Sequence, residues 1–347
     1  MLGYFHSVAE NFDALLVLSF GGPEGPDDVM PFLENVTRGR GIPRERLAEV
    51  AEHYLHFGGV SPINEQNRAL IAALVNELNR HHIELPVYWG NRNWHPFLAD
   101  ALRQMADEGI RRALVFVTSI YSSYSGCRQY REDIARAQTE VGETAPHCAK
   151  IRPFYNHPLF IETMTDRVRD ALEQIPPERR SAAKVLFSAH SIPNSMAATC
   201  DYQVQLEESR RMVAENCGVT NWQIVYQSRS GPPQMPWLEP DVCAVIRELG
   251  EAKSVQDVVI VPIGFVSDHM EVLYDLDDEA AAAADEAGLN FVRAGTAGTH
   301  PTFIAMIREL IEERIADLPP SAVGRFRPRP HECAVDCCKY EPRRPGG

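Results

Sequence analysis

Short apolar runs alternate with longer amphipathic stretches from one end of the chain to the other. In the amphipathic stretches, apolar positions recur three and four residues apart, which is the spacing of one helix face. The apolar runs are continuous, which is typical of parallel strands covered on both faces. This repeated strand–helix–strand order predicts an α/β protein with doubly wound, parallel sheets. The expected strands are residues 14–20, 85–91, 113–121, 150–155, 184–190, 222–228, 257–265 and 290–295.

The expected strands form two sets of four that look like one unit used twice. Each fourth run is followed by a similar segment, "NHPLFIETM" from residue 156 and "THPTFIAMI" from residue 299. Proline in the first turn of a helix loses no backbone hydrogen bond, so each segment is expected to begin a helix that closes its own domain. We predict two similar domains, residues 1–160 and 161–318, each with a parallel four-stranded sheet, and a tail at 319–347.

Length and charge narrow the class of protein. The 347 residues exceed the roughly 250–300 that one hydrophobic core usually organises, which agrees with two domains. The chain carries 34 Lys and Arg against 48 Asp and Glu, a net charge of −14, whereas nucleic-acid binding needs a basic face. Small molecules or metal cations are therefore the expected partners.

The N-terminal segment and the cysteines bear on location. The chain begins without the cationic start and long apolar core of an export signal, and no segment approaches the roughly 18 apolar residues of a membrane helix. The eight cysteines have no regular spacing through the body, unlike a secreted disulfide framework. We expect a soluble, cytoplasmic protein without stable membrane insertion.

One expected strand ends on a histidine. The run "KVLFSAHSIP" is apolar up to Ala189 and then carries His190 and Ser191 before Pro193 stops the strand. In open parallel sheets, ligands bind beyond the carboxyl ends of the strands, so His190 lies where a base or a metal ligand would act. The alternative is a core histidine bonded to a backbone carbonyl, which is the commoner role of a lone histidine.

A column of carboxylates follows another strand of the same half. In "FVSDHMEVLYDLDDEA", Glu271, Asp275 and Glu279 recur every four residues and share one helix face. Like charges at this spacing repel, so helix propensity does not explain them. Taken alone, the column is most simply a solvated acidic face. Together, His190 and Glu271 would form a pair that suits a hard cation or proton transfer.

Glycine-rich loops and tyrosines mark the first half of the chain. "HFGGVSPINEQN" is expected to place Ser61 at a helix N-cap and Pro62 at the first helical position. Capping explains Ser61 as well as ligand contact does, because a helix N-terminus also binds a carboxylate. Tyr121, Tyr124 and Tyr130 follow an expected strand end, where they could pack in the core or form a wall for a flat ligand.

Five of these segments together carry a resemblance to a known family. They are "SFGGPEGPDDVMPFLENVTRGRG", "HFGGVSPINEQN", "SAHSIP", "PPQMPWLEPDV" and "PIGFVSDHMEVLYDLD". In this order they resemble the ferrochelatases, most closely the coproporphyrin ferrochelatases of Gram-positive, actinobacterial type, over residues 12–318. The resemblance implies the class II chelatase fold, with two Rossmann-like domains around a cleft. It also implies a lyase of haem biosynthesis that inserts Fe²⁺ into coproporphyrin III.

The resemblance implies roles for individual residues. His190 falls on the histidine of the family's S-A-H-S motif and Glu271 on the glutamate of its D-H-x-E-V-x-Y-D motif, and these two face each other across the porphyrin in that family. Ser61 and Tyr130 match positions that contact the porphyrin propionates. Phe20 is a departure, because many Gram-positive relatives have there a tyrosine that ligates iron from the other face.

Metal insertion explains why a histidine would stand at the strand end. The reaction removes two pyrrole protons, so the site needs a base near neutral pH. His190 suits that role, and Glu271 can bind the ion or accept a proton, with Asp275 and Glu279 as an outward relay.

Three other functions stay open at this point. A protoporphyrin IX ferrochelatase is the nearest, a cobalt or nickel chelatase would use the same ligands, and a non-catalytic haem or metal carrier would bind porphyrin without turnover. The lack of an anchor or a long exposed apolar segment favours the more polar coproporphyrin III. We expect a monomer and no nucleic-acid partner.

The tail contains a cluster of cysteines. Cys333, Cys337 and Cys338 are one short of the four thiolates that a [2Fe–2S] cluster or a structural zinc ion requires. We predict Cys200, in the loop after the His190 strand, as the fourth ligand, with Cys127 as the alternative. Some ferrochelatases, including actinobacterial ones, carry such a cluster on C-terminal cysteines and one internal cysteine, and this tail resembles that arrangement with a different spacing. The other interpretation is three free thiols on a disordered end.

Overall fold

The structure is a computed structural model that describes residues 11–39, 41–231 and 234–340. It contains two four-stranded sheets whose strand pairs are all parallel, with the orders β2–β1–β3–β4 and β6–β5–β7–β8. The predicted α/β fold with two parallel four-stranded sheets is confirmed. The strands are β1 (Ala14–Ser19), β2 (Val87–Asn91), β3 (Arg112–Val117), β4 (His147–Lys150), β5 (Lys184–His190), β6 (Trp222–Gln227), β7 (Asp257–Val261) and β8 (Asn290–Arg293).

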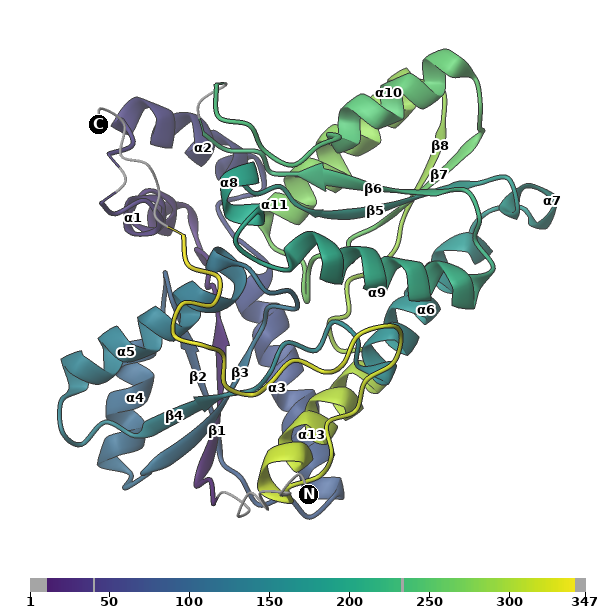
Figure 1. The fold of residues 1–347 in the computed structure, drawn as a ribbon. Coiled ribbons are helices and arrows are strands. Elements are labelled where there is room, and N and C mark those ends of the chain that lie inside the picture. The colour runs from purple at the N-terminus through teal and green to yellow at the C-terminus, as the bar shows by residue number, and fades with distance from the viewer. Residues whose placement is uncertain (1–10, 40, 232–233, 341–347) are drawn as a thin grey trace.

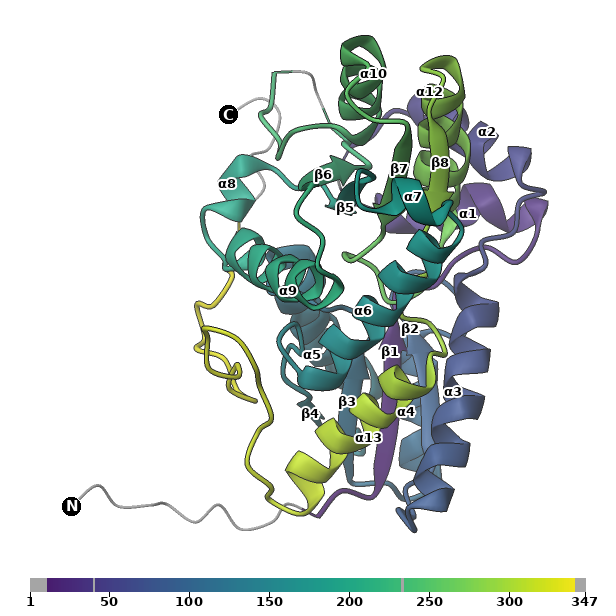
Figure 2. The same ribbon diagram turned by 90° about the vertical axis from the view of Figure 1, so that its right-hand side faces the viewer.

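Helices cover both faces of each sheet and join the strands (Figures 1 and 2). Two of the helical segments, η1 and η2, have π-helical turns. The helices are α1 (Pro26–Val36), α2 (Arg44–His56), α3 (Ile63–Arg80), α4 (Leu98–Asp107), η1 (Tyr124–Arg128), α5 (Gln129–Val141), α6 (Pro158–Glu173), α7 (Pro177–Arg180), α8 (Asn194–Ala197), α9 (Tyr202–Cys217), α10 (Val242–Ala252), α11 (Met270–Val272), η2 (Leu273–Ala280), α12 (Ala281–Glu286) and α13 (Pro301–Ile315).

Central strands form because their side chains are apolar on both faces. In β1, Leu15 and Val17 pack into the large core shared with α3, while Leu16 and Leu18 pack against α4 and α5. All six residues of β1 are buried. We call the sheet β2–β1–β3–β4 with the helices that cover it the N-terminal lobe, and the sheet β6–β5–β7–β8 with its helices the C-terminal lobe. Burial of apolar strand side chains supplies the main stabilisation of each lobe, because apolar area removed from water is worth about 25 cal/mol per Å².

The proline-started helices begin as predicted. Pro158 and Pro301 occupy the first turns of α6 and α13. His157 and His300 precede them as N-caps, and Nδ1 of each ring accepts a hydrogen bond of 3.3 Å from a backbone N–H two residues later. The sequence pattern identified the prolines and missed the histidine caps.

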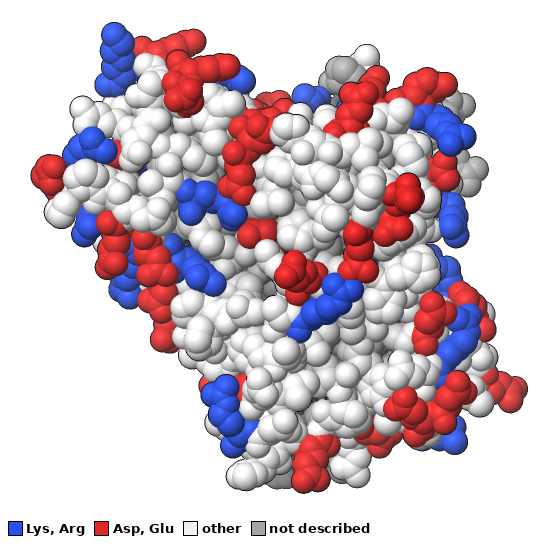
Figure 3. Space-filling model, turned by 180° about the vertical axis from the view of Figure 1, so that it is seen from behind, with Lys and Arg blue, Asp and Glu red and all other residues white. Residues whose placement is uncertain are grey.

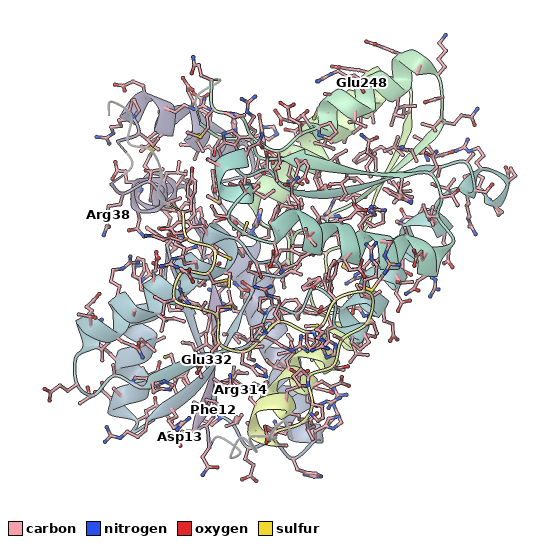
Figure 4. The ribbon with its side chains drawn as sticks, in the orientation of Figure 1. Phe12, Asp13, Arg38, Glu248, Arg314 and Glu332 are labelled. Atoms are coloured by element: carbon pink, nitrogen blue, oxygen red, sulfur yellow. The ribbon has the colours of Figure 1, made fainter. Side chains whose placement is uncertain are left out.

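The helix that follows the fourth strand of each sheet packs against elements of the opposite lobe. α6 packs with α9, β7 and β8 of the C-terminal lobe, whereas α13 packs with α3 of the N-terminal lobe. The ring of Phe303 in α13 lies 6.5 Å from that of Phe116 in β3. The guanidinium of Arg314 lies 5.3 Å from the ring of Phe12, just before β1 (Figure 4). The expectation that each helix closes its own domain is wrong, because proline and periodicity specify a helix but not the sheet that it covers.

The tail runs along both lobes without helix or strand as far as residue 340 (Figures 1 and 2). Arg152 donates to a tail carbonyl at 2.7 Å near its start. Arg325 donates to Glu208 of α9 at 2.7 Å, and Arg329 donates to Asp201 at 2.6 Å. These contacts tie down a segment whose composition alone predicts an extended chain.

No helix in the described ranges is long and apolar enough to cross a membrane. On the face seen in Figure 3, acidic and basic side chains are interspersed, and the basic ones form no broad continuous area among the residues drawn there.

Candidate active site

His190 is the last residue of β5, and its ring is turned toward Glu271. Glu271 belongs to α11, which continues into η2 with Asp275 and Glu279, and we call α11 and η2 together the acidic helix. Its Nδ1 makes a hydrogen bond to the carbonyl of Ser191, and because a carbonyl can only accept, Nδ1 carries the hydrogen. In the neutral ring this leaves the lone pair on Nε2. Nε2 lies 3.5 Å from Oε2 of Glu271, and the two side chains are 36% and 49% exposed. The imidazole is therefore arranged to accept a proton or bind a cation.

Glu271 is placed by the loop between β7 and α11. His269 is the N-cap of α11, and its Nδ1 accepts a hydrogen bond of 3.2 Å from the N–H of Val272. The N–H of Asp268 donates to Gln66 of α3 at 2.8 Å, which ties this loop to the N-terminal lobe. Glu271 thus stands in a first helical turn, where a negative charge is favourable.

The contact between His190 and Glu271 shifts the pKa of each group in favour of its charged form. Burial lowers the pKa of His190, but the hydrogen bond and charge of Glu271 outweigh burial and raise this pKa above its usual value. Burial also opposes ionisation of Glu271, yet His190 lowers the pKa of Glu271 to about 2. The pair combines a carboxylate that is ionised at neutral pH with an imidazole that titrates above its ordinary range.

Asp275 lies one turn further along the acidic helix. Burial raises the pKa of Asp275 to about 7, even though the hydroxyl of Ser228 donates to its carboxylate. The amide of Gln227 donates to Asp275 Oδ2 at 3.2 Å and to the backbone carbonyl of Glu271 at 3.3 Å. A carboxyl group that titrates near neutral pH can take up and release protons during turnover.

Glu279, the third carboxylate of the column, lies near His53 and Tyr274. Burial raises the pKa of Glu279, and the groups that act on it most after burial are His53 and Tyr274. The expected order from Glu271 through Asp275 to Glu279 therefore stays a prediction.

Helix α2 contacts the acidic helix through side chains that the sequence motifs did not single out. The ring of His53 stacks on that of Tyr274 at 4.0 Å between centroids, and His56 Nε2 lies 3.5 Å from Asp278 Oδ2. Tyr54 lies near the two carboxylates of the site, and burial together with their charges raises its pKa. The periodicity of α2 predicts a helix, but nothing in it indicates which distant segment it contacts.

Phe20 stands at the position where the resemblance implies an axial tyrosine in many relatives. Its ring is 36% exposed and packs edge-on against Phe32 at 6.3 Å. The guanidinium of Arg92 lies 5.9 Å from the Phe20 ring and 4.5 Å from the Tyr130 ring. Arg92 is ion-paired with Asp133. Phe20 offers no oxygen ligand, and the cation beside it is a residue that the motifs did not single out.

Ser61 and Tyr130 are both buried, with 4% and 5% exposed. Helix α3 begins at Ile63, and Pro62 is its N-cap, without a side-chain cap hydrogen bond. Helix α3 thus begins one residue later than predicted, with Pro62 and not Ser61 as its N-cap, although the backbone angles of Pro62 are helical.

Cys127 of η1 meets the tail. Arg131 donates to the carbonyl of Cys333 at 3.4 Å. The Cys333 thiol and the charges of Lys150 and Arg131 lower the pKa of Cys127, although burial opposes the shift. Cys127 is thus a buried thiol that lies next to Cys333 of the tail.

The remaining tail cysteines lie near Cys200. The sulfur atoms of Cys337 and Cys338 are 3.6 Å apart. Cys200 donates to the carbonyl of Met196 at 3.3 Å, and the charges of Cys337 and Cys127 act on its pKa, which burial raises. In the part of the chain that the structure covers, no three His, Cys, Asp or Glu side chains are arranged to hold a metal ion. The thiols are gathered, but they are not grouped around a single point.

Known proteins resemble this chain over nearly its whole length. A family profile described as Ferrochelatase matches residues 12–315. A protein named Ferrochelatase from Rhodopirellula baltica is 58% identical over 337 residues, covering 96% of this chain and 95% of the relative. Coproporphyrin III ferrochelatase from Streptomyces coelicolor is 51% identical and covers 97% of this chain and 96% of its own. The protein of the same name from Mycolicibacterium smegmatis is 53% identical and covers 92% and 95%.

Solved structures share the fold at low sequence identity. SirB from Bacillus subtilis, solved with Fe³⁺, has a TM-score of 0.56 and 14% identity, covering 88% of this chain and 96% of its own. DR2241 from Deinococcus radiodurans, described as similar in structure to chelatases, has a TM-score of 0.52 and 16% identity, covering 86% and 55%. The expected chelatase fold is therefore confirmed.

Proposed function

The chain belongs to the ferrochelatase family and is a metal chelatase, and from that premise we propose that it inserts Fe²⁺ into coproporphyrin III. Relatives that are 51% and 53% identical to it carry the name Coproporphyrin III ferrochelatase. The product would be Fe-coproporphyrin, which is made during haem biosynthesis.

The observation that carries the proposal is the contact between His190 and Glu271. Insertion exchanges two pyrrole protons for one Fe²⁺, so both protons must leave the ring. Nε2 of neutral His190 holds a lone pair and accepts the first proton. Glu271, ionised at neutral pH, attracts the incoming dication and stabilises the imidazolium that forms. Asp275, which titrates near pH 7, takes up the second proton next to this pair, and both protons then pass to solvent.

We also propose that the porphyrin propionates contact Ser61 and Tyr130. Support comes from the family positions of the two residues and from the cation beside Tyr130, the guanidinium of Arg92 at 4.5 Å. Arginine binds carboxylates well because its donors form a planar fork. In this arrangement Phe20 contributes an apolar face and no iron ligand.

A [2Fe–2S] cluster on the tail remains our proposal for the cysteines. Cys333, Cys337 and Cys338 would supply three ligands, and Cys200 or Cys127 the fourth. The number of thiols is sufficient for such a cluster, because four thiolates are required and three segments supply five cysteines, but in the described residues these thiols are not grouped around a single point. The pairing of Cys127 with Cys333 favours Cys127. When bound, the cluster would supply a redox-active link between tail and body.

Location and assembly are proposals as well. We propose that the protein acts in the cytoplasm as a monomer, without a nucleic-acid partner. The net charge of −14 supports the last point, because phosphate binding requires a basic surface. Light scattering on the purified protein measures the mass in solution.

The choice of porphyrin is tested by direct comparison. A protoporphyrin IX ferrochelatase is the second candidate, because the relative with 58% identity is named only Ferrochelatase. Purified protein is mixed anaerobically with Fe²⁺ and either coproporphyrin III or protoporphyrin IX, and loss of the free-base absorption is followed. We expect the larger kcat/KM with coproporphyrin III. An equal or larger value with protoporphyrin IX would refute this substrate, and parallel assays with Co²⁺ and Ni²⁺ test the metal.

A further inference from the structure

Two buried tyrosines bond the chain segments that carry the catalytic pair. The hydroxyl of Tyr202 donates to the backbone carbonyl of His190 at 2.9 Å. The hydroxyl of Tyr121 donates to the backbone carbonyl of Ile263 at 3.2 Å. Ile263 follows β7 and begins the loop that leads to Glu271. Each tyrosine thus fixes the backbone of one of the two segments.

The two tyrosine rings also pack against each other across the lobes. Tyr121 follows β3 of the N-terminal lobe, and Tyr202 begins α9 of the C-terminal lobe. Their ring centroids are 5.9 Å apart with an interplanar angle of 86°, an edge-to-face arrangement that is favourable for aromatic rings. The two tyrosines that make these hydrogen bonds are therefore in direct contact across the lobes.

The segments that the tyrosines hold approach each other closely. The N–H of Gly264 donates to the carbonyl of Ser188 at 3.1 Å. A Cβ on Gly264 would lie 2.7 Å from Cα of Ala189, so only glycine allows this approach. The backbone next to His190 and the start of the Glu271 loop are in contact, and a shift of either segment changes the distance between the two side chains.

We propose that Tyr121 and Tyr202 are positioning residues that hold His190 and Glu271 at the spacing required for metal insertion. The proposal rests on the roles given above to His190 and Glu271. Small displacements of reacting groups cost large factors in rate, and a shift of about 1 Å can cost roughly 100-fold. Burial raises the pKa of both tyrosines, so the hydroxyls stay protonated and continue to donate.

The test compares Tyr121→Phe and Tyr202→Phe with Tyr226→Phe. Tyr226 is a matched control, because it is a buried tyrosine of the same lobe as Tyr202 and the side chain that acts on the pKa of its hydroxyl is that of Gln203. Iron insertion into coproporphyrin III gives kcat and KM, and thermal unfolding gives the stability of each variant. We expect kcat to fall about five- to twentyfold in each of the first two variants, with the porphyrin KM within about twofold of wild type. The control should lose comparable stability and keep its kcat.

A second measurement does not depend on turnover. Co²⁺ is titrated into the porphyrin-free protein, and the part of the binding that His190→Ala abolishes is assigned to the catalytic pair. Tyr121→Phe and Tyr202→Phe should weaken that part about three- to tenfold, and Tyr226→Phe should not. If both kcat and Co²⁺ affinity match the control, the positioning role is refuted. A wild type that binds Co²⁺ but inserts no iron would refute the proposed function, and the Co²⁺ comparison would still decide the positioning role.

Discussion

The side chain of Gln227 holds Asp275 by a hydrogen bond of 3.2 Å, from the end of β6 to the second turn of the acidic helix. The hydroxyl of Ser228 donates to the same carboxylate. Burial nevertheless raises the pKa of Asp275 to about 7. Asp275, which lies next to the His190–Glu271 pair, therefore changes its charge near pH 7.

Asp275→Asn should change the pH dependence of stability. Because the pKa of Asp275 is raised in the folded state, its stabilising contribution is complete below the unfolded pKa of about 4 and is lost as the pH rises through about 7. Asparagine is neutral at every pH. The free energy of unfolding of the variant minus that of wild type should therefore increase from pH 4 to pH 8, by on the order of 2 to 4 kcal/mol. Urea unfolding at both pH values measures this gain, and an equal difference at the two pH values would contradict it.

Glu271→Gln should lower the pKa of His190, because Glu271 raises that pKa through its hydrogen bond and charge. NMR titration of the imidazole protons reports the shift. The variant should also lose at least about 100-fold in kcat, as expected when an essential group of a proton-transfer site is removed. Asp275→Asn should slow turnover less.

Glu248→Gln is the control for this pKa measurement, because Glu248 is exposed on α10 (Figure 4) and is not among the groups that shift the pKa of His190. Its substitution should leave the titration of His190 where it is in wild type. An unchanged His190 pKa in Glu271→Gln would mean that the two groups are not coupled in solution.

Ser61→Ala and Tyr130→Phe should each weaken coproporphyrin III binding by roughly one hydrogen bond, about 1 kcal/mol or a fivefold rise in Kd. Quenching of porphyrin fluorescence on titration measures the affinity. A porphyrin ester without free carboxylates is the matched ligand, and its affinity should be the same for wild type and variants. Equal losses with the ester would show that the effect does not come from the propionates.

The cysteine proposal predicts a coloured protein. Anaerobically purified wild type should be reddish before porphyrin is added, with about two irons and two acid-labile sulfides per chain. Serine at Cys333, Cys337 or Cys338 should remove the colour. Comparison of Cys127→Ser with Cys200→Ser identifies the fourth ligand, and the thiol contact of Cys127 with Cys333 predicts that Cys127→Ser is the bleached one. A colourless wild type without iron and sulfide would exclude the cluster.

Features that local chemistry determines could be predicted from the sequence. The eight strands follow from apolar runs, and His190 and Glu271 were selected because strand ends in parallel sheets meet at one edge. Their side chains do lie together, at 3.5 Å. The prolines of α6 and α13 were also found, since proline has a clear preference for a first helical turn.

Features that depend on long-range packing were not predictable in this way. The exchange of α6 and α13 between the lobes leaves no local signal, because an amphipathic helix has the same pattern whichever sheet it covers. The stacking of His53 on Tyr274 likewise joins segments that are far apart in the chain. Tyr121 was noted as a wall residue, whereas its hydroxyl bonds a backbone carbonyl, a partner that sequence does not encode.

The most direct test of the account concerns His190 as the group that accepts the pyrrole proton. In His190→Ala, coproporphyrin III affinity is measured by fluorescence quenching and iron insertion by absorption under anaerobic conditions. His147→Ala, at an exposed position in β4, serves as the control. We predict porphyrin affinity within about threefold of wild type and iron insertion below about 1% of the wild-type rate, because the propionate contacts remain and the base is gone. Iron insertion by His190→Ala at a rate similar to wild type would contradict the account.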